Sequence, residues 1–514
     1  MAVIDDLKHL PVISDLESLM VDLLPVDFDK WCSARKTPKI LHDALWGTFV
    51  LNPHEVAILD TPLFQRLRFV HQTGAVSFTY PSARHTRFEH VLGVMLQASK
   101  MCQALASRPD ESRFDRAFEL QVRFAGLLHD IGHGPFSHTS EQYFSKDPAI
   151  AEIQSHNYYR DSGAGEVLSS LMIQTPRFRE FAQFVSQFYK VKLDIDLTSN
   201  MITGNLPNEE MYVGEFVHGP FDADKLDYMH RDGMFSGLKL QIDLDRLYAS
   251  IDVVRGEDKF GESFTRLAGS IAGVAPLTQI MFNKMLLFTG MYHHHKVRAV
   301  DCMLWALFEL AEKNDSTIGG FKINSPINFL RLTDDAVLSP SQSNNVAIQK
   351  IINDIRNRNL WKRALVISRQ TVTKSILSSK SKGNSSPLTK YINFGGNDPE
   401  CIRIRREMAK KIWEKAGKPC EEHEVWLDIP SSPSMTESKR MWIVDRGIKK
   451  PLTLGEYMPI QQWVEYYGHH RWKSHVFCPP HVRDSINIAA QEVFKAELGL
   501  EFNELATAQA NIDR

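Results

Sequence analysis

Apolar side chains recur at helical spacing through most of the first 310 residues. Within residues 1–38, one apolar face is formed by Leu16, Leu19, Met20, Leu23 and Leu24. Positions three and four residues apart lie on one side of a helix, so this spacing predicts a helical extension that packs on the rest of the chain. From about residue 38 to residue 310, similar segments are separated by Gly, Pro and Asn. This punctuation predicts a succession of helices.

The pattern changes in the last third of the chain. Residues 367–400 are rich in Ser, Lys and Gly, which indicates an exposed or mobile connection. After a basic helix near residues 402–415, the segments VWLDIP, RMWIVD and KSHVFCPP alternate apolar with polar residues, as short strands do. A last helix is expected around residues 484–498. We predict a mainly α fold, with a helical core over 39–366 and a smaller α/β lobe over 401–514.

Composition narrows the class of protein. The 514 residues are 43% hydrophobic, enough for a buried core, and the net charge of −2 provides no overall positive field for nucleic acid. The six cysteines form no CxxC pair, which disfavours a disulfide framework and suits a reducing cytoplasm. The N-terminus MAVIDDLKHL is unlike a signal peptide, and no apolar run approaches the ~18 residues that span a bilayer. We expect a cytoplasmic globular protein without a membrane segment.

The segment GLLHDIGHGPFSH places His129 and Asp130 where a helix should end. Apolar residues before the pair predict a buried helix, and two glycines and a proline then break it. Adjacent residues on a regular helix point about 100° apart, so the pair can share a metal only at such an end. His90 lies upstream in RFEH, and the acidic cluster DADKLDY lies downstream. Together these nitrogen and oxygen ligands suit one divalent Mn, Fe, Zn or Ni ion.

Two other interpretations of these residues compete with a shared metal. Packing alone is a poor explanation, because His129, Asp130, His133 and His138 near apolar helices would each need a polar partner. His129 and His133 could instead form an i, i+4 zinc pair. No HExxH motif is present, however, and Gly132 weakens the helix that would carry such a pair.

Three motifs follow one another along the chain: KILHDALWG through RFEHVLGV, then GLLHDIGHGPFSH, then DADKLDYMHRD. Together they resemble the HD-domain deoxynucleoside triphosphate triphosphohydrolases, the dGTPase-like family that includes animal members with a sterile-alpha-motif domain and bacterial relatives. The resemblance is strong from about Lys39 to Lys296 and thinner beyond, and no sterile-alpha-motif domain is evident. It implies an HD-domain helical catalytic core that converts a dNTP to a deoxynucleoside and inorganic triphosphate.

The resemblance assigns roles to individual residues. It implies a metal site formed by His90, His129, Asp130 and Asp224. It implies substrate contacts from Arg87, Gln72, Lys225, Tyr228, Asp232, Lys284 and Tyr292. The cationic residues would hold the triphosphate, with its Mg²⁺, because cations neutralise a polyphosphate. Tyr228 would exclude a 2′-hydroxyl, and Gln72 and Asp232 would bind the 3′-hydroxyl; Tyr228 also suits an ordinary core position.

Histidines further along match the active-site histidines of the family. His133, His138 and His156 could orient water or protonate the leaving 5′-oxygen, since imidazole titrates near neutral pH. We expect His138 to be the general acid, because Glu141 lies one turn later and would raise its pKa. Near Tyr292 the register is uncertain by one residue, because three consecutive histidines follow it; these could instead scavenge metal. Lys284 replaces an arginine of the family and lacks its bidentate fork.

A nucleotide-activator pocket is also implied by the resemblance. The residues that match it are Lys39, Ile40, Asp60, Gln65 and Arg68, whereas His42 stands where the family often has asparagine. Alternatively, Asp60 caps a helix beginning TPLFQRL and Arg68 faces solvent. Such pockets form between subunits in the relatives, so a homo-oligomer with a dNTP or GTP activator is expected.

Two rival functions stay open. Another HD phosphohydrolase, acting on a cyclic nucleotide, a monophosphate or an alarmone, would share the metal site but not the triphosphate and sugar contacts. A non-catalytic nucleotide or single-stranded nucleic-acid binder would use the basic helix near Arg405, whose charges otherwise form a solvated face.

Overall fold

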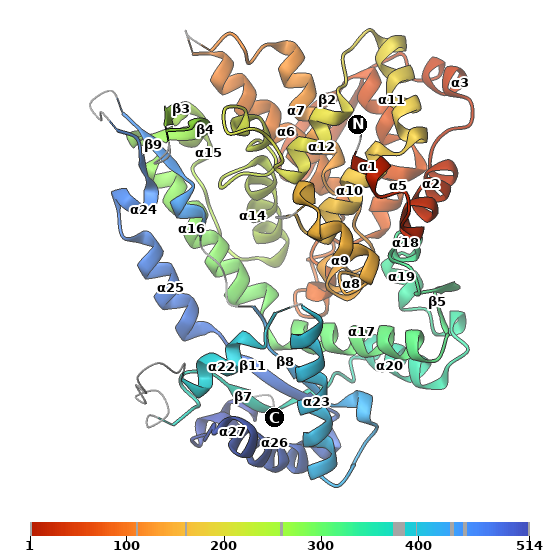
Figure 1. Cartoon of the computed structure of the whole chain (residues 1–514), viewed down its shortest axis with the longest axis vertical. Coiled ribbons are helices and arrows are strands. Elements are labelled where there is room, and N and C mark those ends of the chain that lie inside the picture. The colour runs from red at the N-terminus through yellow and green to blue at the C-terminus, as the bar shows by residue number, and fades with distance from the viewer. Residues whose placement is uncertain are drawn as a thin grey trace.

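A bundle of long helices forms the centre of the protein. The computed structural model describes residues 3–108, 111–159, 162–257, 261–373, 386–396, 398–431, 436–445 and 450–511. In Figure 1 the helix α6 (Arg87–Ala106) runs beside α7 (Arg116–Leu128), and α14 (Ala223–Ser236) packs on α6. The prediction of a mainly α fold is confirmed.

The central helices have the capping residues that their sequences indicate. The side chain of Asp115 accepts a hydrogen bond from the N–H of Phe118 at the start of α7. At the start of α6, the carboxylate of Glu89 accepts hydrogen bonds from the backbone N–H and the hydroxyl of Thr86. The apolar face of α7 is fully buried in the main core, which fixes the direction in which the helix ends.

The helices predicted within residues 1–38 are present. They are α1 (Val3–Asp6), α2 (Pro11–Leu23) and α3 (Phe28–Ser33). Leu16, Leu19 and Met20 on α2 are buried in the main hydrophobic core, as the helical spacing indicates.

Strands interrupt the region that was expected to be helical throughout. The hairpin β1 (Lys39–Asp43) and β2 (Gly47–Leu51) precedes the central helices. A second hairpin joins β3 (Ile251–Glu257) to β4 (Ser263–Ser270), and β9 (Trp442–Val444) pairs in parallel with β4. The short strand β10 (Leu452–Thr453) completes this sheet in the order β10-β9-β4-β3. The prediction of a succession of helices alone was wrong at these segments, because tertiary strand pairing outweighed the local helical pattern.

A second hydrophobic core lies in the lower part of Figure 1. Its sheet has the order β7-β11-β8, with β7 (Lys362–Ile367), β11 (Ser474–Cys478) and β8 (Trp426–Asp428). The helices α23 (Pro399–Lys415), α26 (Arg483–Leu498) and α27 (Leu505–Ala510) pack around it. Two sheets therefore contain strands from both sides of the predicted boundary at residues 366 to 401, and that domain division stays a prediction.

The predicted mobile connection is partly folded. Residues 374–385 and 397 lie outside the described residues. Within the described part, α22 (Pro387–Asn393) buries Leu388 and Tyr391 in the second core. The expectation of an exposed connection was wrong for this helix, because two large apolar side chains anchor it.

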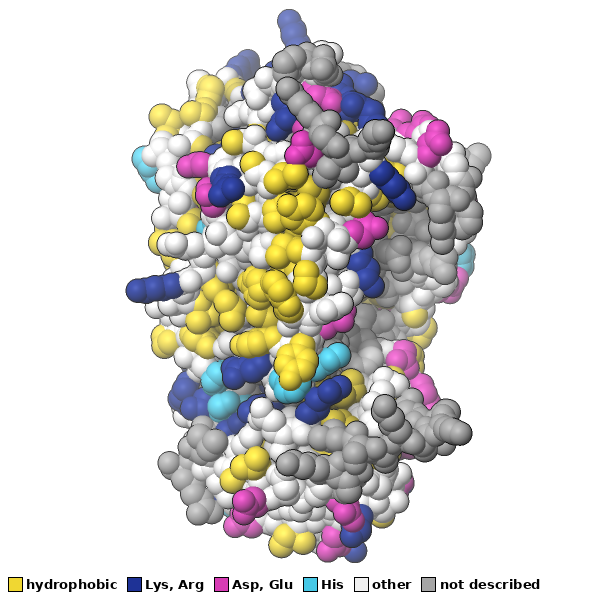
Figure 2. Space-filling view, turned by 90° about the vertical axis from the view of Figure 1, so that its left-hand side faces the viewer, with side chains coloured by type: hydrophobic (Ala, Val, Ile, Leu, Met, Phe, Trp, Pro, Cys, Tyr) yellow, Lys and Arg dark blue, Asp and Glu magenta, His cyan; other side chains and the backbone are white. Residues whose placement is uncertain are grey.

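Apolar side chains gather on the face shown in Figure 2. The elements on this side of the molecule include α16 (Val274–Leu287), the π-helical turn η5 (Phe288–Tyr292) and α25 (Ile460–Arg471). Among the described residues, one helical stretch, 271–292, is long and apolar enough to cross a membrane, judged by length and composition alone. The sequence was expected to contain no such stretch. Its helix α16 packs against α14, α15 (Leu244–Ser250) and α25.

Candidate active site

Four predicted metal ligands from three segments meet in one place. His90 Nε2 lies 3.1 Å from Asp224 Oδ1 and 3.5 Å from Asp130 Oδ2. His129 Nε2 lies 3.6 Å from Asp130 Oδ1 and 3.9 Å from Asp224 Oδ1. His90, His129 and Asp130 are buried, whereas Asp224 is partly open. Helices α6, α7 and α14 thus each bring a ligand, or a pair of ligands, to one point.

The helix ends where the glycine and proline pattern predicts. His129 is the C-terminal cap of α7 and still has helical dihedral angles (φ −59°, ψ −30°), so the helix ends directly after it. Phe136 and Ser137 then adopt positive φ angles of 55° and 49°. The backbone N–H of Phe136 donates to Asp334 Oδ1 at 2.7 Å, which holds this unfavourable turn in place.

The ring nitrogens of the two histidines are oriented toward a common centre. His90 Nδ1 donates to Asp227 Oδ2 at 2.8 Å, and His129 Nδ1 donates to the carbonyl of Gly126 at 2.8 Å. Each bond leaves Nε2 to face Asp224, whose Oδ1 atom lies 3.1 Å from His90 Nε2 but outside hydrogen-bond geometry, so neither buried Nε2 atom has a hydrogen-bond partner. A buried imidazole nitrogen without a partner is costly, and a metal ion would satisfy both. The donor set therefore fits a divalent cation.

The electrostatic environment of the predicted metal ligands favours the charged forms of His90 and Asp130. Burial lowers the pKa of His90, but the carboxylates of Asp224 and Asp227 outweigh it and raise the pKa to about 10. Burial raises the pKa of Asp130, but Arg87 and the neighbouring histidines hold it well below its usual value. Asp130 is therefore ionised, as a metal ligand must be.

A second group of polar side chains lies beside the first. His138, which begins α8 (His138–Phe144), donates from Nδ1 to Glu141 Oε2 at 2.7 Å. His133 Nε2 lies 3.5 Å from the same oxygen, and its Nδ1 lies 3.2 Å from Asp130 Oδ1. His133 therefore links the two groups.

The titration of this second group follows its contacts. Desolvation lowers the pKa of His138, but the hydrogen bond to Glu141 raises it above its usual value, as predicted. Burial and Arg87 lower the pKa of His133. The side chain of His138 is 72% exposed, so it is the more accessible of the two imidazoles.

His156 is placed differently from the other predicted histidines. It follows α9 (Pro148–Ser155), and its Nδ1 accepts a hydrogen bond from the backbone N–H of Tyr158 at 3.2 Å. Among the described residues it does not join the group of His133, His138 and Glu141.

Predicted sugar-binding residues cluster on α14. Asp224, Tyr228 and Asp232 occupy one face of this helix at the predicted spacing. Tyr292 donates its hydroxyl proton to Asp232 Oδ2, and His85 Nε2 lies 2.7 Å from Asp232 Oδ1. Burial, then the nearby carboxylates, raise the pKa of Tyr228 well above its usual value, so its hydroxyl stays protonated. The π-helical turn inserts an extra residue immediately before the histidine run, where the register could not be assigned from sequence.

Two predicted substrate residues present buried atoms without partners. Arg87 donates from Nε to Ser137 Oγ at 2.9 Å and from Nη1 to Asp130, while its Nη2 has no partner. Gln72 has a buried Oε1 without a partner. Unsatisfied buried donors and acceptors of this kind are typical of ligand sites.

The two predicted phosphate-binding lysines are already engaged. Lys225 Nζ donates to the carbonyl of Gly219 at 2.9 Å and to Asp222 Oδ2 at 2.8 Å. Lys284 Nζ bonds Glu437 Oε1, which comes from the short helix η8 (Thr436–Lys439). Glu437 thus brings a carboxylate to a lysine that was predicted to hold a triphosphate.

The predicted activator residues form two contacts on the surface. Lys39 Nζ and Arg35 Nε donate to Asp60 Oδ2 at 2.8 and 2.9 Å. Arg68 Nε donates to Gln65 Oε1 at 2.8 Å, and Ile40 on β1 is 66% exposed. The alternative in which Asp60 caps the next helix was wrong, because Thr61 is the residue before α5 (Pro62–Gln65).

Sequence reasoning missed three contributors to the site. Asp227 and His85 lie within the quoted motifs, so their closeness to the predicted ligands in sequence was visible. Their hydrogen-bond partners, His90 and Asp232, could not be read from the sequence. Glu437 lies more than 150 residues from Lys284 in sequence, and no local signal connects the two.

The basic helix α23 pairs its charges within the protein. Arg403 bonds Glu400 and Glu407, and Lys411 Nζ lies 2.7 Å from Glu497 Oε1. Arg405 donates to the carbonyls of Phe394 and Gly396, both at 2.7 Å. These contacts are those of a structural helix and favour the solvated-face interpretation over nucleic-acid binding.

Comparison with known proteins agrees with this geometry. The HD domain family matches residues 87–169, and the HD associated region matches residues 242–392 and 397–501. An uncharacterized protein of Methanocaldococcus jannaschii is 26% identical over 471 residues, which cover 88% of this chain and 84% of that protein. The deoxynucleoside triphosphate triphosphohydrolase SAMHD1 homolog of Dictyostelium discoideum is 27% identical over 350 residues, which cover 65% of this chain. The deoxynucleoside triphosphate triphosphohydrolase SAMHD1 of Homo sapiens is 27% identical over 357 residues, 63% of this chain. The matched regions span 62% and 55% of those two relatives.

Proposed function

This chain belongs to the HD superfamily of hydrolases, and from that premise we propose that it is a metal-dependent dNTP triphosphohydrolase. In the proposed reaction, water attacks the α-phosphorus of a dNTP and releases a deoxynucleoside and inorganic triphosphate. The named activity of the SAMHD1 relatives supports this choice of substrate.

One observation carries the proposal. The unpartnered Nε2 atoms of His90 and His129 face Asp224, on the same helix face as Tyr228 and Asp232. A cation bound at the first group would therefore lie beside the side chains proposed for the sugar. This juxtaposition suits a substrate that carries both phosphates and a deoxyribose.

The proposed ligands of the metal are His90, His129, Asp130 and Asp224, and Mn, Fe, Zn or Ni suits their nitrogen and oxygen donors. A bound metal would polarise a phosphate oxygen and so favour attack at phosphorus. Arg87 would direct its unpartnered Nη2 toward the phosphates, which enter with Mg²⁺. The positive charge of Arg87 would stabilise charge that develops during the reaction.

Proton transfer is assigned to the second histidine group. His138 would donate a proton to the departing 5′-oxygen, because Glu141 favours its protonated form. His133, with its lowered pKa, would stay neutral and orient the attacking water. His156 stays a predicted alternative acid.

The sugar pocket would discriminate by shape. Tyr228 would pack against the deoxyribose and leave no room for a 2′-hydroxyl, while Gln72 Oε1 would accept a hydrogen bond from the 3′-hydroxyl. Asp232 already accepts from Tyr292, so it would position that tyrosine as well as bind the sugar.

Nucleotide activation of a homo-oligomer is a further part of the proposal. Lys39, Asp60, Gln65 and Arg68 lie on the surface as a subunit contact would require, and Ile40 is exposed beside them. A rise in dATP turnover on addition of dGTP or GTP would support activation, and an unchanged rate would refute it. We also propose a cytoplasmic location, which the six unbridged cysteines suit.

A second candidate function is favoured by the engaged lysines. Asp222 and Glu437 place carboxylates on Lys225 and Lys284, where a triphosphate would meet repulsion unless it displaced them. A substrate with fewer phosphates, such as a cyclic nucleotide, a monophosphate or an alarmone, would avoid that conflict in part. Incubation with the four dNTPs, the four rNTPs and these alternatives, in the presence of Mn²⁺, followed by chromatography of the products, distinguishes the two functions. Inorganic triphosphate from dNTPs supports the first, and turnover of the alternatives alone supports the second.

A further inference from the structure

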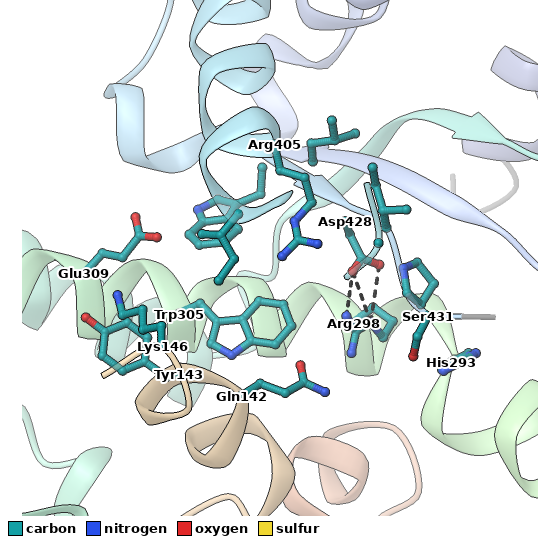
Figure 3. A pocket seen from close by; sticks show the side chains of 16 residues that line it. Gln142, Tyr143, Lys146, His293, Arg298, Trp305, Glu309, Arg405, Asp428 and Ser431 are labelled. Carbon is teal, nitrogen blue, oxygen red and sulfur yellow. Dashed lines mark hydrogen bonds and ion pairs between the residues drawn. The ribbon is translucent and has the colours of Figure 1, made fainter. Parts of the chain in front are cut away.

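A cavity separate from the metal site lies between the two hydrophobic cores. Its volume is about 100 Å³, whereas one buried water needs on the order of 10–15 Å³, so it has room for a small organic molecule. Side chains from α8, α17 (His295–Lys313), α23 and β8 line it. Figure 3 shows Arg405 reaching down from α23 toward Trp305 and toward the pair formed by Arg298 and Asp428.

The charges around this cavity are unevenly paired. Arg298 Nη2 lies 2.6 Å from Asp428 Oδ1, and Lys146 Nζ lies 3.2 Å from Glu312 Oε2. Arg405 donates only from Nη1, and both acceptors are backbone carbonyls. Among the described arginine and lysine residues that line the cavity, Arg405 is thus the one without a carboxylate within ion-pair distance.

The environment of Arg405 makes this lack of a counter-ion costly. Burial lowers the pKa of Arg405, even though Asp428 acts in the opposite direction. The carbonyls of Phe394 and Gly396 replace part of the hydration that this cation loses, but no carboxylate of the described residues lies within ion-pair distance to balance its charge. A carboxylate or phosphate from a ligand would supply the missing charge and accept the free N–H groups of the guanidinium.

Aromatic side chains form the apolar part of the same cavity. The ring centroids of Trp305 and Trp426 lie 6.1 Å apart, with an interplanar angle of 36°. Both indole N–H groups are already satisfied, by the carbonyls of Thr139 and His423 at 2.9 Å. The guanidinium of Arg406 covers Trp426 at 4.3 Å. The guanidinium of Arg298 lies 5.1 Å from the ring centroid of Trp305, so what remains for a ligand is the part of the Trp305 ring surface that Arg298 leaves uncovered.

We propose that this cavity binds a small organic anion whose carboxylate or phosphate pairs with Arg405 and whose flat ring packs against Trp305. Neither the metal ligands nor the residues assigned to the sugar line the cavity, so the site is distinct from the one described above.

The cavity is joined to the catalytic group through α8. Gln142 and Tyr143 of this helix line the cavity, and His138 begins the same helix. Thr139 Oγ1 donates to Asp301 Oδ1 at 2.8 Å, and Asp301 Oδ2 lies 3.2 Å from Arg298 Nη1. A ligand between Arg405 and Trp305 would hold these contacts together, and it would therefore stiffen α8 next to His138.

Binding is tested on the full chain with two probes, benzoate and phenyl phosphate, which separate a carboxylate source from a phosphate source. Inorganic phosphate and benzyl alcohol serve as the anion alone and the ring alone. Calorimetric titration is expected to show one saturable site for at least one of the two probes, with weaker binding of both partial probes. Arg405→Gln should weaken that binding at least tenfold, whereas Arg403→Gln, on the exposed face of α23, should leave it unchanged.

A second variant covers the case in which Arg405→Gln disturbs the carbonyls that Arg405 holds. Ile402 lines the cavity one turn earlier on α23, so Ile402→Trp fills the space and leaves the guanidinium contacts intact. Its predicted effect is loss of probe binding with an unchanged melting temperature. Hydrogen exchange should slow in residues 138–144 of the wild type when the probe is present. The proposal would be overturned if neither probe saturated at 10 mM, or if Ile402→Trp still bound the probe. None of these measurements depends on dNTP turnover, so they are independent of the proposed function.

Discussion

Asp227→Asn tests how the metal site is oriented. Asp227 is fully buried, and its Oδ2 atom accepts hydrogen bonds from His90 Nδ1 and from Arg231 Nε, each at 2.8 Å. Its Oδ1 atom accepts from Arg231 Nη2 at 2.9 Å and from the indole of Trp46. Asparagine keeps the shape but replaces one acceptor with an N–H donor, so Arg231 meets that donor in either orientation of the amide, together with either His90 or Trp46. Where the amide N–H faces His90 Nδ1, that hydrogen bond is lost, and the imidazole of His90 is no longer held with its Nε2 atom toward Asp224.

The expected magnitude follows from these contacts. Removal of an acceptor that orients a metal-binding histidine weakens metal affinity by roughly 10- to 100-fold, about 1.4 to 2.7 kcal/mol. Folding should lose on the order of 1–3 kcal/mol, because a buried hydrogen bond to a charged group is replaced by a poorer one. Arg231 keeps its ion pair with Asp43 at 2.9 Å, which limits that loss and allows the variant to fold.

Asp43→Asn is the matched control. It removes the other carboxylate partner of Arg231, so it should lower stability by a similar amount without touching His90. Affinity for Mn²⁺ is measured by competition with a chromophoric chelator, and stability by urea unfolding of the same samples. Folded Asp227→Asn protein that binds Mn²⁺ within twofold of the wild type would refute the reasoning, as would equal loss of Mn²⁺ affinity in Asp43→Asn.

Three further predictions concern the substrate pocket. Glu141→Gln removes the negative charge that helps raise the pKa of His138, so protonated His138 is lost at lower pH and the alkaline limb of the kcat profile should move acidward by about half a pH unit or more. An unmoved alkaline limb, with activity otherwise intact, argues against His138 as the acid. Glu437→Gln releases Lys284 from its carboxylate, so the KM for dATP should fall by roughly 2- to 10-fold in steady-state assays, and a raised KM would show that Lys284 does not meet the triphosphate. Tyr228→Ala opens the space proposed to exclude a 2′-hydroxyl, so the ratio of dATP to ATP turnover should fall about tenfold or more. If that ratio stays constant in competition assays, the tyrosine is a core residue.

The local sequence was enough to predict the end of the helix that carries His129, whereas Asp224 was identified as a metal ligand only through the resemblance, and the ligand set stays a prediction. A helix broken by glycine and proline leaves few ways for His129 and Asp130 to point, and the structure has the expected ending. The pairing of His138 with Glu141 was also predictable, because residues three apart on a helix are neighbours.

Contacts between distant segments were not predictable from local pattern. Glu437 reaches Lys284 only because β9 pairs with β4 and so brings the residues before β9 beside α16. The hairpin of β3 and β4 was missed because its residues do not alternate strictly between buried and exposed; the neighbours Val253 and Val254, for example, are both buried. Helical periodicity also dominates the sequence around it. The helix α22 was missed for a related reason, since its two buried residues stand in an otherwise polar segment.

Hydrolysis in water enriched with ¹⁸O tests the central claim most directly. Attack at the α-phosphorus, with the metal ligands and His138 acting together, places the isotope in inorganic triphosphate and leaves the deoxynucleoside unlabelled. The account predicts this pattern for the wild type and no product from the variant in which His129 and Asp130 are both replaced by alanine. Label in orthophosphate or pyrophosphate, label in the deoxynucleoside, or unchanged turnover by the double variant would contradict it.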